Sequence, residues 1–150
     1  MCSKAERAML CPMAPTPFHT PLRIRYGETD QMGVVHHASF LGYLEDARTL
    51  FMQELGHSYA ELESAGIGLP VRSLSISYRS SARFGEELDA AVWVAGLSRA
   101  SVTFGYEIKC TTDDRVVLHA EIELACTKIS RDALKVTALP GALRDALSAY

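Results

Sequence analysis

The longest amphipathic segment of the chain covers residues 37–55. Apolar side chains recur there three or four residues apart, a spacing that places them on one face of an α-helix. They are Phe40, Leu44, Ala47, Phe51 and Leu55. Gly56 follows at once, and glycine is the usual residue just past a helix C-terminus. A second, shorter helix is predicted over residues 58–65, ended by Gly66.

Four other segments alternate apolar and polar residues, the pattern of a half-buried strand. They are residues 22–26, 74–78, 102–108 and 118–126. A further segment, 88–97, is apolar on both faces, which predicts a central strand or one whose second face is covered by another subunit. After Pro140, Leu143 and Leu147 predict a short C-terminal helix.

These elements predict the fold class. One long helix with a broad apolar stripe must pack on an apolar surface, and the only one available is the inner face of an antiparallel sheet of about five strands. We therefore predict an α+β domain over residues 21–150, in which the sheet wraps around the helix, and we expect it to self-associate. Residues 1–20 contain prolines at positions 12, 15 and 17 and are expected to form a flexible arm.

Composition narrows the functional classes. The 150 residues include 15 basic and 18 acidic side chains, a net charge of −3, which gives no broad attraction to nucleic acid or anionic lipid. No apolar run approaches the roughly 20 residues that span a bilayer, and the first 21 residues lack the apolar stretch of a secretory signal. The four cysteines form no Cys-x-x-Cys pair. We therefore expect a cytoplasmic protein without a membrane span, a disulfide framework or a zinc site.

The densest group of chemically useful residues lies in residues 26–37, between the first strand and the long helix. Asp30 stands seven residues before His37, too early to cap the helix, although a turn-forming role is the simplest alternative. Gly33 allows a ligand to approach the backbone closely. The free N–H groups at the helix start can polarise a carbonyl, and a nearby carboxylate can attack it or activate water. This pair suits the hydrolysis of a thioester. Asp30, His36 and His37 lack metal-ligand spacing, so no metal is predicted.

The same segment carries an ordered motif, Y-x-x-T-D-x-x-G-V-V-x-H followed by an aromatic residue, Leu, an aromatic residue, Glu, Ala and Arg. The matching residues are Tyr26, Thr29, Asp30, Gly33, Val34, Val35, His37, Phe40, Leu41, Tyr43, Glu45, Ala47 and Arg48. In this the chain resembles the hotdog-fold acyl-CoA thioesterases of the 4-hydroxybenzoyl-CoA thioesterase-like family, and most of all their Tol-Pal-associated bacterial branch. The likeness extends over about residues 20–145.

The resemblance implies a hotdog fold, a homodimer or homotetramer, and active sites at subunit interfaces. It makes Asp30 the catalytic carboxylate, with His37 and Tyr26 in the site and the His37 backbone N–H as an oxyanion donor. Gly33 and Val34 are expected beside the substrate. An acyl-CoA needs cations for its phosphates, and Arg83 and Arg99 are the candidates. No cofactor is implied, because coenzyme A is part of the substrate; an acyl carrier protein is an alternative carrier.

Two other functions remain open from the sequence. A hotdog hydratase or dehydratase would use an Asp and His pair to add or remove water, and a binding module would hold an acyl-CoA or acyl carrier protein without turnover. On the long helix, we expect Glu45 and Arg48 to form an intrahelical ion pair. We expect Leu44, Phe51 and Met52 to pack in the core rather than line an acyl pocket.

Overall fold

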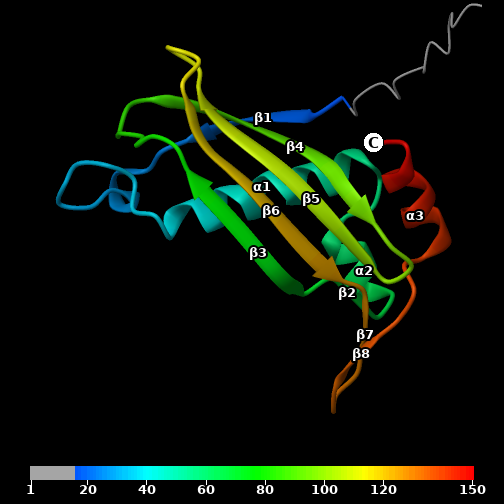
Figure 1. Cartoon of the computed structure of the whole chain (residues 1–150). Helices are drawn as coiled ribbons and strands as arrows, with labels where there is room; N and C mark the ends of the chain where they lie inside the picture. The colour runs from blue at the N-terminus through cyan, green and yellow to red at the C-terminus, as the bar shows by residue number, and fades with distance from the viewer. Residues whose placement is uncertain (1–15) are drawn as a thin grey trace, which may run out of the picture.

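The computed structural model describes residues 16–150, which form a curved antiparallel sheet around one long helix (Figure 1). The order of strands in this sheet is β1-β4-β5-β6-β3. The strands are β1 (Phe18–Arg23), β3 (Val71–Tyr78), β4 (Glu87–Leu97), β5 (Ser101–Cys110) and β6 (Val116–Ala125). This arrangement confirms the predicted α+β class with five strands.

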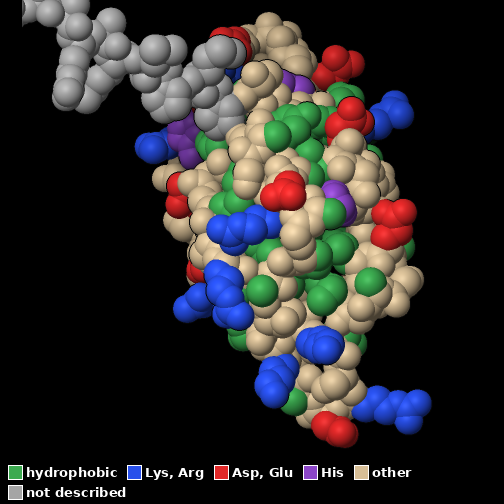
Figure 2. Space-filling model, turned by 90° about the vertical axis from the view of Figure 1, so that its right-hand side faces the viewer, with side chains coloured by type: hydrophobic (Ala, Val, Ile, Leu, Met, Phe, Trp, Pro, Cys, Tyr) green, Lys and Arg blue, Asp and Glu red, His purple; other side chains and the backbone are tan. Residues whose placement is uncertain are grey.

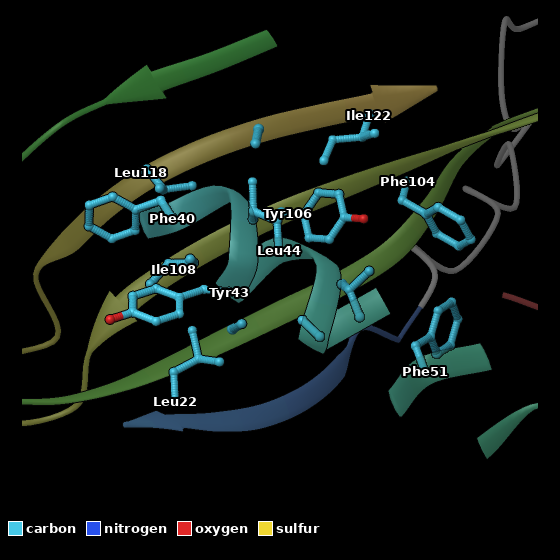
Figure 3. Packing of buried hydrophobic residues seen from close by; sticks show 14 of the residues in the cluster. Leu22, Phe40, Tyr43, Leu44, Phe51, Phe104, Tyr106, Ile108, Leu118 and Ile122 are labelled. Carbon is cyan, nitrogen blue, oxygen red and sulfur yellow. The ribbon is translucent and has the colours of Figure 1, made fainter. Parts of the chain in front are cut away.

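The long helix, α1 (Ser39–Glu54), lies against the concave face of the sheet. Its apolar stripe is buried as predicted: Leu44, Ala47, Phe51 and Met52 are all 0% exposed. They pack against residues of β5 and β6 such as Phe104, Ile108, Leu118 and Ile122 (Figure 3). The helix ends before Gly56, whose φ of +76° is left-handed backbone that glycine adopts without strain.

The shorter elements sit around the C-terminal end of α1. Helix α2 (Tyr59–Ser64) begins with a capping box, in which Ser58 and Glu61 satisfy each other's backbone N–H groups. A small sheet joins β2 (Ile67–Gly68), β7 (Thr127–Ile129) and β8 (Leu134–Val136). Helix α3 (Gly141–Ser148) buries Leu143 and Leu147 completely, as their spacing predicted.

The first strand differs from the prediction. It begins at Phe18 and ends at Arg23, whereas the sequence pattern indicated residues 22–26. Leu22 and Ile24 are buried as expected, but Tyr26 is 78% exposed and belongs to a 3-10 helix, Tyr26–Glu28. Pairing with β4 determines the start of β1, and this edge position tolerates Pro21. Residues 18–20 thus belong to the sheet rather than to an arm, and residues 1–15 of the predicted arm lie outside the described part.

Strand β4 lies inside the sheet, between β1 and β5, as its two apolar faces predicted. On the convex face its Trp93 ring lies directly over Gly105 of β5, so close that a Cβ at Gly105 would be 2.5 Å from Trp93 Cε2. The neighbouring Ala91 is only 6% exposed. The indole therefore covers part of this face from within the chain, and cover by another subunit stays a prediction.

Strand β3 occupies one edge of the sheet, where it pairs with β6 alone. Its apolar side chains are poorly covered: Val71, Leu74 and Tyr78 are 48%, 49% and 48% exposed. An exposed, apolar edge strand is a template for pairing with another strand. No helix in the described part of the chain is long and apolar enough to cross a membrane.

Candidate active site

Asp30 lies in a tight turn that its own side chain stabilises. Its Oδ1 accepts the Met32 backbone N–H at 2.8 Å, an Asx turn, and its backbone N–H donates to the Val34 carbonyl at 2.9 Å. Gly33 closes the turn with a φ of +73°, which explains the glycine. Within residues 16–150 the second carboxylate oxygen, Oδ2, has no hydrogen-bond partner. One oxygen therefore holds the carboxylate in place while the other is free to act.

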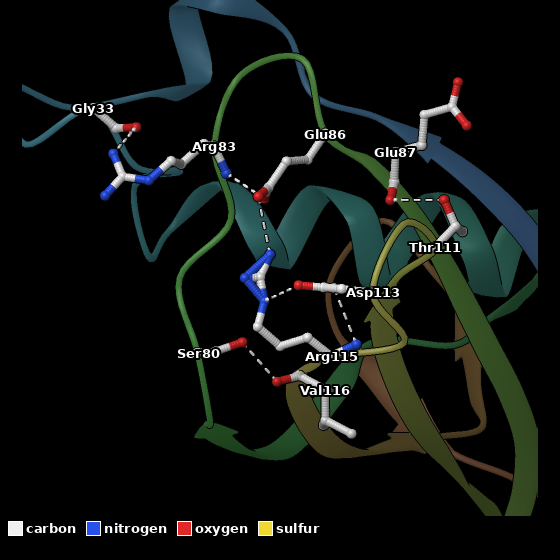
Figure 4. Close-up of polar contacts among 9 residues, drawn as sticks. All are labelled: Gly33, Ser80, Arg83, Glu86, Glu87, Thr111, Asp113, Arg115 and Val116. Carbon is white, nitrogen blue, oxygen red and sulfur yellow. Dashed lines mark hydrogen bonds and ion pairs between the residues drawn. The ribbon is translucent and has the colours of Figure 1, made fainter.

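Three contacts fix this turn to the rest of the molecule. The Val35 backbone N–H donates to the Ala82 carbonyl at 2.8 Å, and the His36 N–H donates to the Glu28 carbonyl at 2.8 Å. Arg83 Nη1 reaches the Gly33 carbonyl at 3.5 Å (Figure 4). The loop before β4 and the turn of Asp30 thus form one unit, in which Arg83 lies beside Gly33.

His37 stands at the start of α1, although the helix begins two residues later than predicted, at Ser39. The Tyr78 hydroxyl donates to the His37 carbonyl at 2.9 Å. His36 Nδ1 accepts the Ala38 backbone N–H at 3.2 Å, and the His36 and His37 rings lie 4.3 Å apart. In the described part of the chain no group accepts the His37 backbone N–H. That N–H is a free donor at the positive end of the helix dipole, available for a developing oxyanion.

Of the other predicted site residues, some lie near the Asp30 turn and one lies far from it. Val34 is part of the Asp30 turn. The exposed Tyr26 ring stacks edge-to-face on Phe84, with 5.6 Å between centroids, and makes no hydrogen bond to Asp30. Arg99 lies in the turn between β4 and β5, and Figure 1 shows that this turn is at the opposite end of the sheet from the loop between β1 and α1, which contains Asp30. Figure 2 views this far end, where Lys and Arg side chains gather toward the β7–β8 hairpin. Arg83 and Arg99 of one chain therefore cannot share a site.

Sequence reasoning missed a polar contact under the loop. The Glu28 carboxylate accepts the Arg25 backbone N–H at 2.7 Å and the Tyr43 hydroxyl. Burial, together with this carboxylate, raises the pKa of Tyr43 far above its usual value, so the phenol stays protonated. The three-residue spacing from Arg25 to Glu28 is a local capping signal that the sequence contains, whereas the Tyr43 contact spans fifteen residues.

The predicted ion pair between Glu45 and Arg48 is wrong. Arg48 turns into the protein, where it is only 6% exposed, and its guanidinium donates to the hydroxyls of Tyr59 and Tyr106. Glu45 stays on the exposed face of α1. The sequence could not show this, because Tyr106 lies 58 residues further along the chain.

Among residues 16–150, no three His, Cys, Asp or Glu side chains are grouped closely enough to hold a metal ion. The groups available for catalysis at the Asp30 turn are a fixed carboxylate with one free oxygen, a free backbone N–H at the start of α1, and the guanidinium of Arg83. This set can activate water or attack a carbonyl, and it can stabilise the negative charge that develops.

Comparison with known proteins identifies relatives of this chain by sequence. The chain is 36% identical to the putative acyl-CoA thioesterase YneP of Bacillus subtilis over 87 residues, which span 58% of this chain and 63% of that protein. It is 28% identical to the acyl-CoA thioester hydrolase YbgC of Escherichia coli O157:H7 over 128 residues, 85% of this chain and 93% of that protein.

Solved structures show the same fold. A DHNA-CoA thioesterase from Staphylococcus aureus superposes with a TM-score of 0.80 at 33% identity, over 89% of this chain and 88% of that one. The 4-hydroxybenzoyl-CoA thioesterase of Pseudomonas sp. strain CBS-3 superposes with a TM-score of 0.81 at 19% identity, over 87% and 99% of the two chains. The thioesterase-like superfamily matches residues 24–147, and the chain belongs to this superfamily.

Proposed function

We propose that this protein hydrolyses acyl-CoA thioesters to a free acid and coenzyme A, with Asp30 as the catalytic carboxylate. The observation that carries the proposal is the Asp30 turn itself: Oδ1 is held by the Met32 N–H, Oδ2 is free, and the free His37 N–H lies at the helix start just beyond. Membership of the superfamily and the likeness to YbgC and YneP support it.

In the proposed reaction the His37 N–H binds the thioester carbonyl oxygen. As general base, Asp30 takes a proton from water while the water oxygen bonds to the carbonyl carbon, and the tetrahedral intermediate then expels the CoA thiolate, which takes up a proton. As nucleophile, Asp30 would instead bond to the carbonyl carbon and expel the CoA thiolate, which takes up a proton; water then opens the resulting anhydride, which frees the acid and restores Asp30. Both routes need an ionised Asp30. Tyr26, Gly33 and Val34 are proposed to border the substrate.

For the CoA phosphates, we propose Arg83, whose guanidinium lies at the rim of the Asp30 turn. Arg99 can serve the same site only if a second copy of the chain brings it there. The open edge of β3 supports such self-association, as a homodimer or a pair of dimers. The Tol-Pal-associated branch, an acyl carrier protein as alternative carrier and a cytoplasmic location stay predictions.

The test is Asp30→Asn in a thiol-release assay with short aliphatic, long aliphatic and benzoyl-type CoA thioesters. The change keeps the shape and removes the charge. We expect kcat/KM to fall about a hundredfold or more, because general-base assistance contributes about 10² to 10⁴ in rate. Asp145→Asn, an exposed aspartate on α3, is the matched control.

Activity of the Asp30→Asn protein within a few fold of the unchanged protein would disprove the mechanism. Double-bond chemistry without release of thiol would instead identify a hydratase or dehydratase. Saturable binding of these thioesters with no turnover would identify a binding module.

A further inference from the structure

Arg48 is an unusual residue of this molecule because its charge is buried without a counter-charge. It is 6% exposed, and none of the groups that act on its guanidinium in the described part of the chain is a carboxylate. Buried charges are normally paired, since transfer from water to the protein interior is costly. A buried guanidinium without a counter-charge is therefore suited to bind an anionic group.

The two partners of Arg48 do not supply that group. Its Nε donates to the Tyr59 hydroxyl at 2.8 Å and its Nη1 to the Tyr106 hydroxyl at 3.4 Å. Burial raises the pKa of Tyr59, and that of Tyr106 to about 12, so both phenols keep their protons at neutral pH. Within residues 16–150 neither hydroxyl proton finds an acceptor. The two hydroxyls thus accept from Arg48 but keep O–H protons without acceptors, and a ligand with acceptor oxygens would satisfy these donors.

A hollow of about 560 Å³ opens beside this cluster. Arg48 and Tyr59 form its polar wall, and the apolar wall consists of Leu69, Pro70, Val71, Ile129 and Leu134. Glu45 and Glu63 also border it, but both are exposed to water. The apolar wall suits a ligand with an apolar body, and the donors of Arg48 and Tyr59 suit acceptor oxygens at the end of that ligand.

The geometry of β3 relates this hollow to the catalytic loop. The hollow includes Val71, the first residue of β3, whereas Tyr78, the last, binds the His37 carbonyl. If two copies of β3 pair antiparallel along their full length, symmetry places Val71 of one copy opposite Tyr78 of the other. The Asp30 loop of one copy then faces the Arg48 hollow of its neighbour.

We infer that Arg48, with Tyr59, binds the far end of the acyl group whose thioester lies at Asp30 of a second copy, and that the preferred acyl groups end in a carboxylate. This inference rests on the proposed hydrolysis and assigns to it a substrate class. A charge-assisted hydrogen bond to the guanidinium distinguishes such acyl groups from apolar ones of the same shape.

The first experiment compares two thioesters that differ only at the far end of the ring, 4-carboxybenzoyl-CoA and 4-methylbenzoyl-CoA. We expect kcat/KM to favour the carboxylated substrate about tenfold or more, and Arg48→Met to lower kcat/KM for the carboxylated substrate far more than for the methyl substrate, which abolishes the preference. Tyr59→Phe, which removes one hydroxyl, should reduce the preference by a few fold. Arg131→Met removes a charge from an exposed turn and should change neither rate.

The second experiment tests the contribution across the interface. Asp30→Asn and Arg48→Met chains are co-expressed in equal amounts. If each site takes Asp30 from one chain and Arg48 from the other, every mixed dimer contains one intact site. About half of the randomly formed dimers are mixed, so about one quarter of all sites are intact. Activity on the carboxylated substrate should therefore exceed that of either variant alone. If Arg48 served Asp30 of its own chain, no intact site would form and no activity would return.

A direct binding measurement separates this inference from the proposed function. Calorimetry with monomethyl terephthalate and methyl 4-methylbenzoate, both neutral at the end where the thioester would lie, should show tighter binding of the carboxylate-bearing ester, lost in Arg48→Met protein that unfolds at an unchanged temperature. If no thioester is turned over but this binding pattern holds, the proposed function fails and the anion site stands. Equal kcat/KM for both thioesters, an equal loss on both in Arg48→Met, or equal binding of both esters overturns the inference.

Discussion

At the scale of single residues, Gly33 shows how a backbone conformation determines which amino acid occupies a position. Its φ of +73° is left-handed, while a Cβ there would meet only Arg83 Nη1, at an ordinary 3.5 Å. We expect Gly33→Ala to lower the free energy of unfolding by about 1–2 kcal/mol through backbone strain alone, measured by urea denaturation. Gly27→Ala is the control, since nothing lies within 4 Å of its added Cβ and its φ is not positive. Equal stability of the two variants would show that strain at Gly33 is negligible.

The residue scale also shows which parts of the site the sequence could predict. The turn from Asp30 to Val34 is local, so residue types and spacing were enough to indicate a turn with Gly33 beside Asp30. The Arg48 cluster is not local: Tyr59 lies 11 and Tyr106 58 residues away. An arginine three residues after a glutamate on a helix predicts an ion pair, and only the tertiary fold shows that Arg48 faces inward instead.

At the scale of elements, the local sequence pattern determines the limits of the helix, whereas the paired strand determines the limits of a strand. The period of α1 and the glycine after it are local signals, and the helix was predicted to within two residues at its start. The limits of β1 depend on its partner β4, with Phe18 opposite Val92, and prolines in the flanking sequence concealed that strand. Arg83 precedes β4 and Arg99 follows it, so an extended strand of 11 residues separates the two arginines within one chain.

The contact between β4 and β5 leads to a prediction at this scale. Because a Cβ at Gly105 would lie 2.5 Å from the Trp93 ring, Gly105→Ala must displace the indole, and we expect a loss of about 1–3 kcal/mol in unfolding free energy. In a Trp93→Ala background the same change should cost far less, since the obstacle is gone. A double-mutant cycle in urea measures the coupling, and effects that simply add would show that the indole moves aside freely.

At the scale of the whole molecule, the open edge of β3 determines how copies assemble and whether the site is complete. Leu74 is 49% exposed in the single chain, so Leu74→Lys should leave the chain folded but place a charge in a β3–β3 interface. We expect its dimer dissociation constant, measured by sedimentation equilibrium, to rise at least about tenfold. Val136→Lys, 67% exposed in the β7–β8 hairpin, should leave assembly unchanged.

The fraction of dimer and the preference for the carboxylated thioester should change together in the Leu74→Lys protein. If the Arg48 hollow of one copy serves Asp30 of its neighbour, dilution of the Leu74→Lys protein below its dissociation constant separates the two halves of every site. Preference for 4-carboxybenzoyl-CoA over 4-methylbenzoyl-CoA should fall with the dimer fraction and return when the protein is concentrated. A preference that persists in the monomer would place the anion site and the catalytic carboxylate in one chain, and an unchanged molecular mass would exclude β3 as the dimer interface.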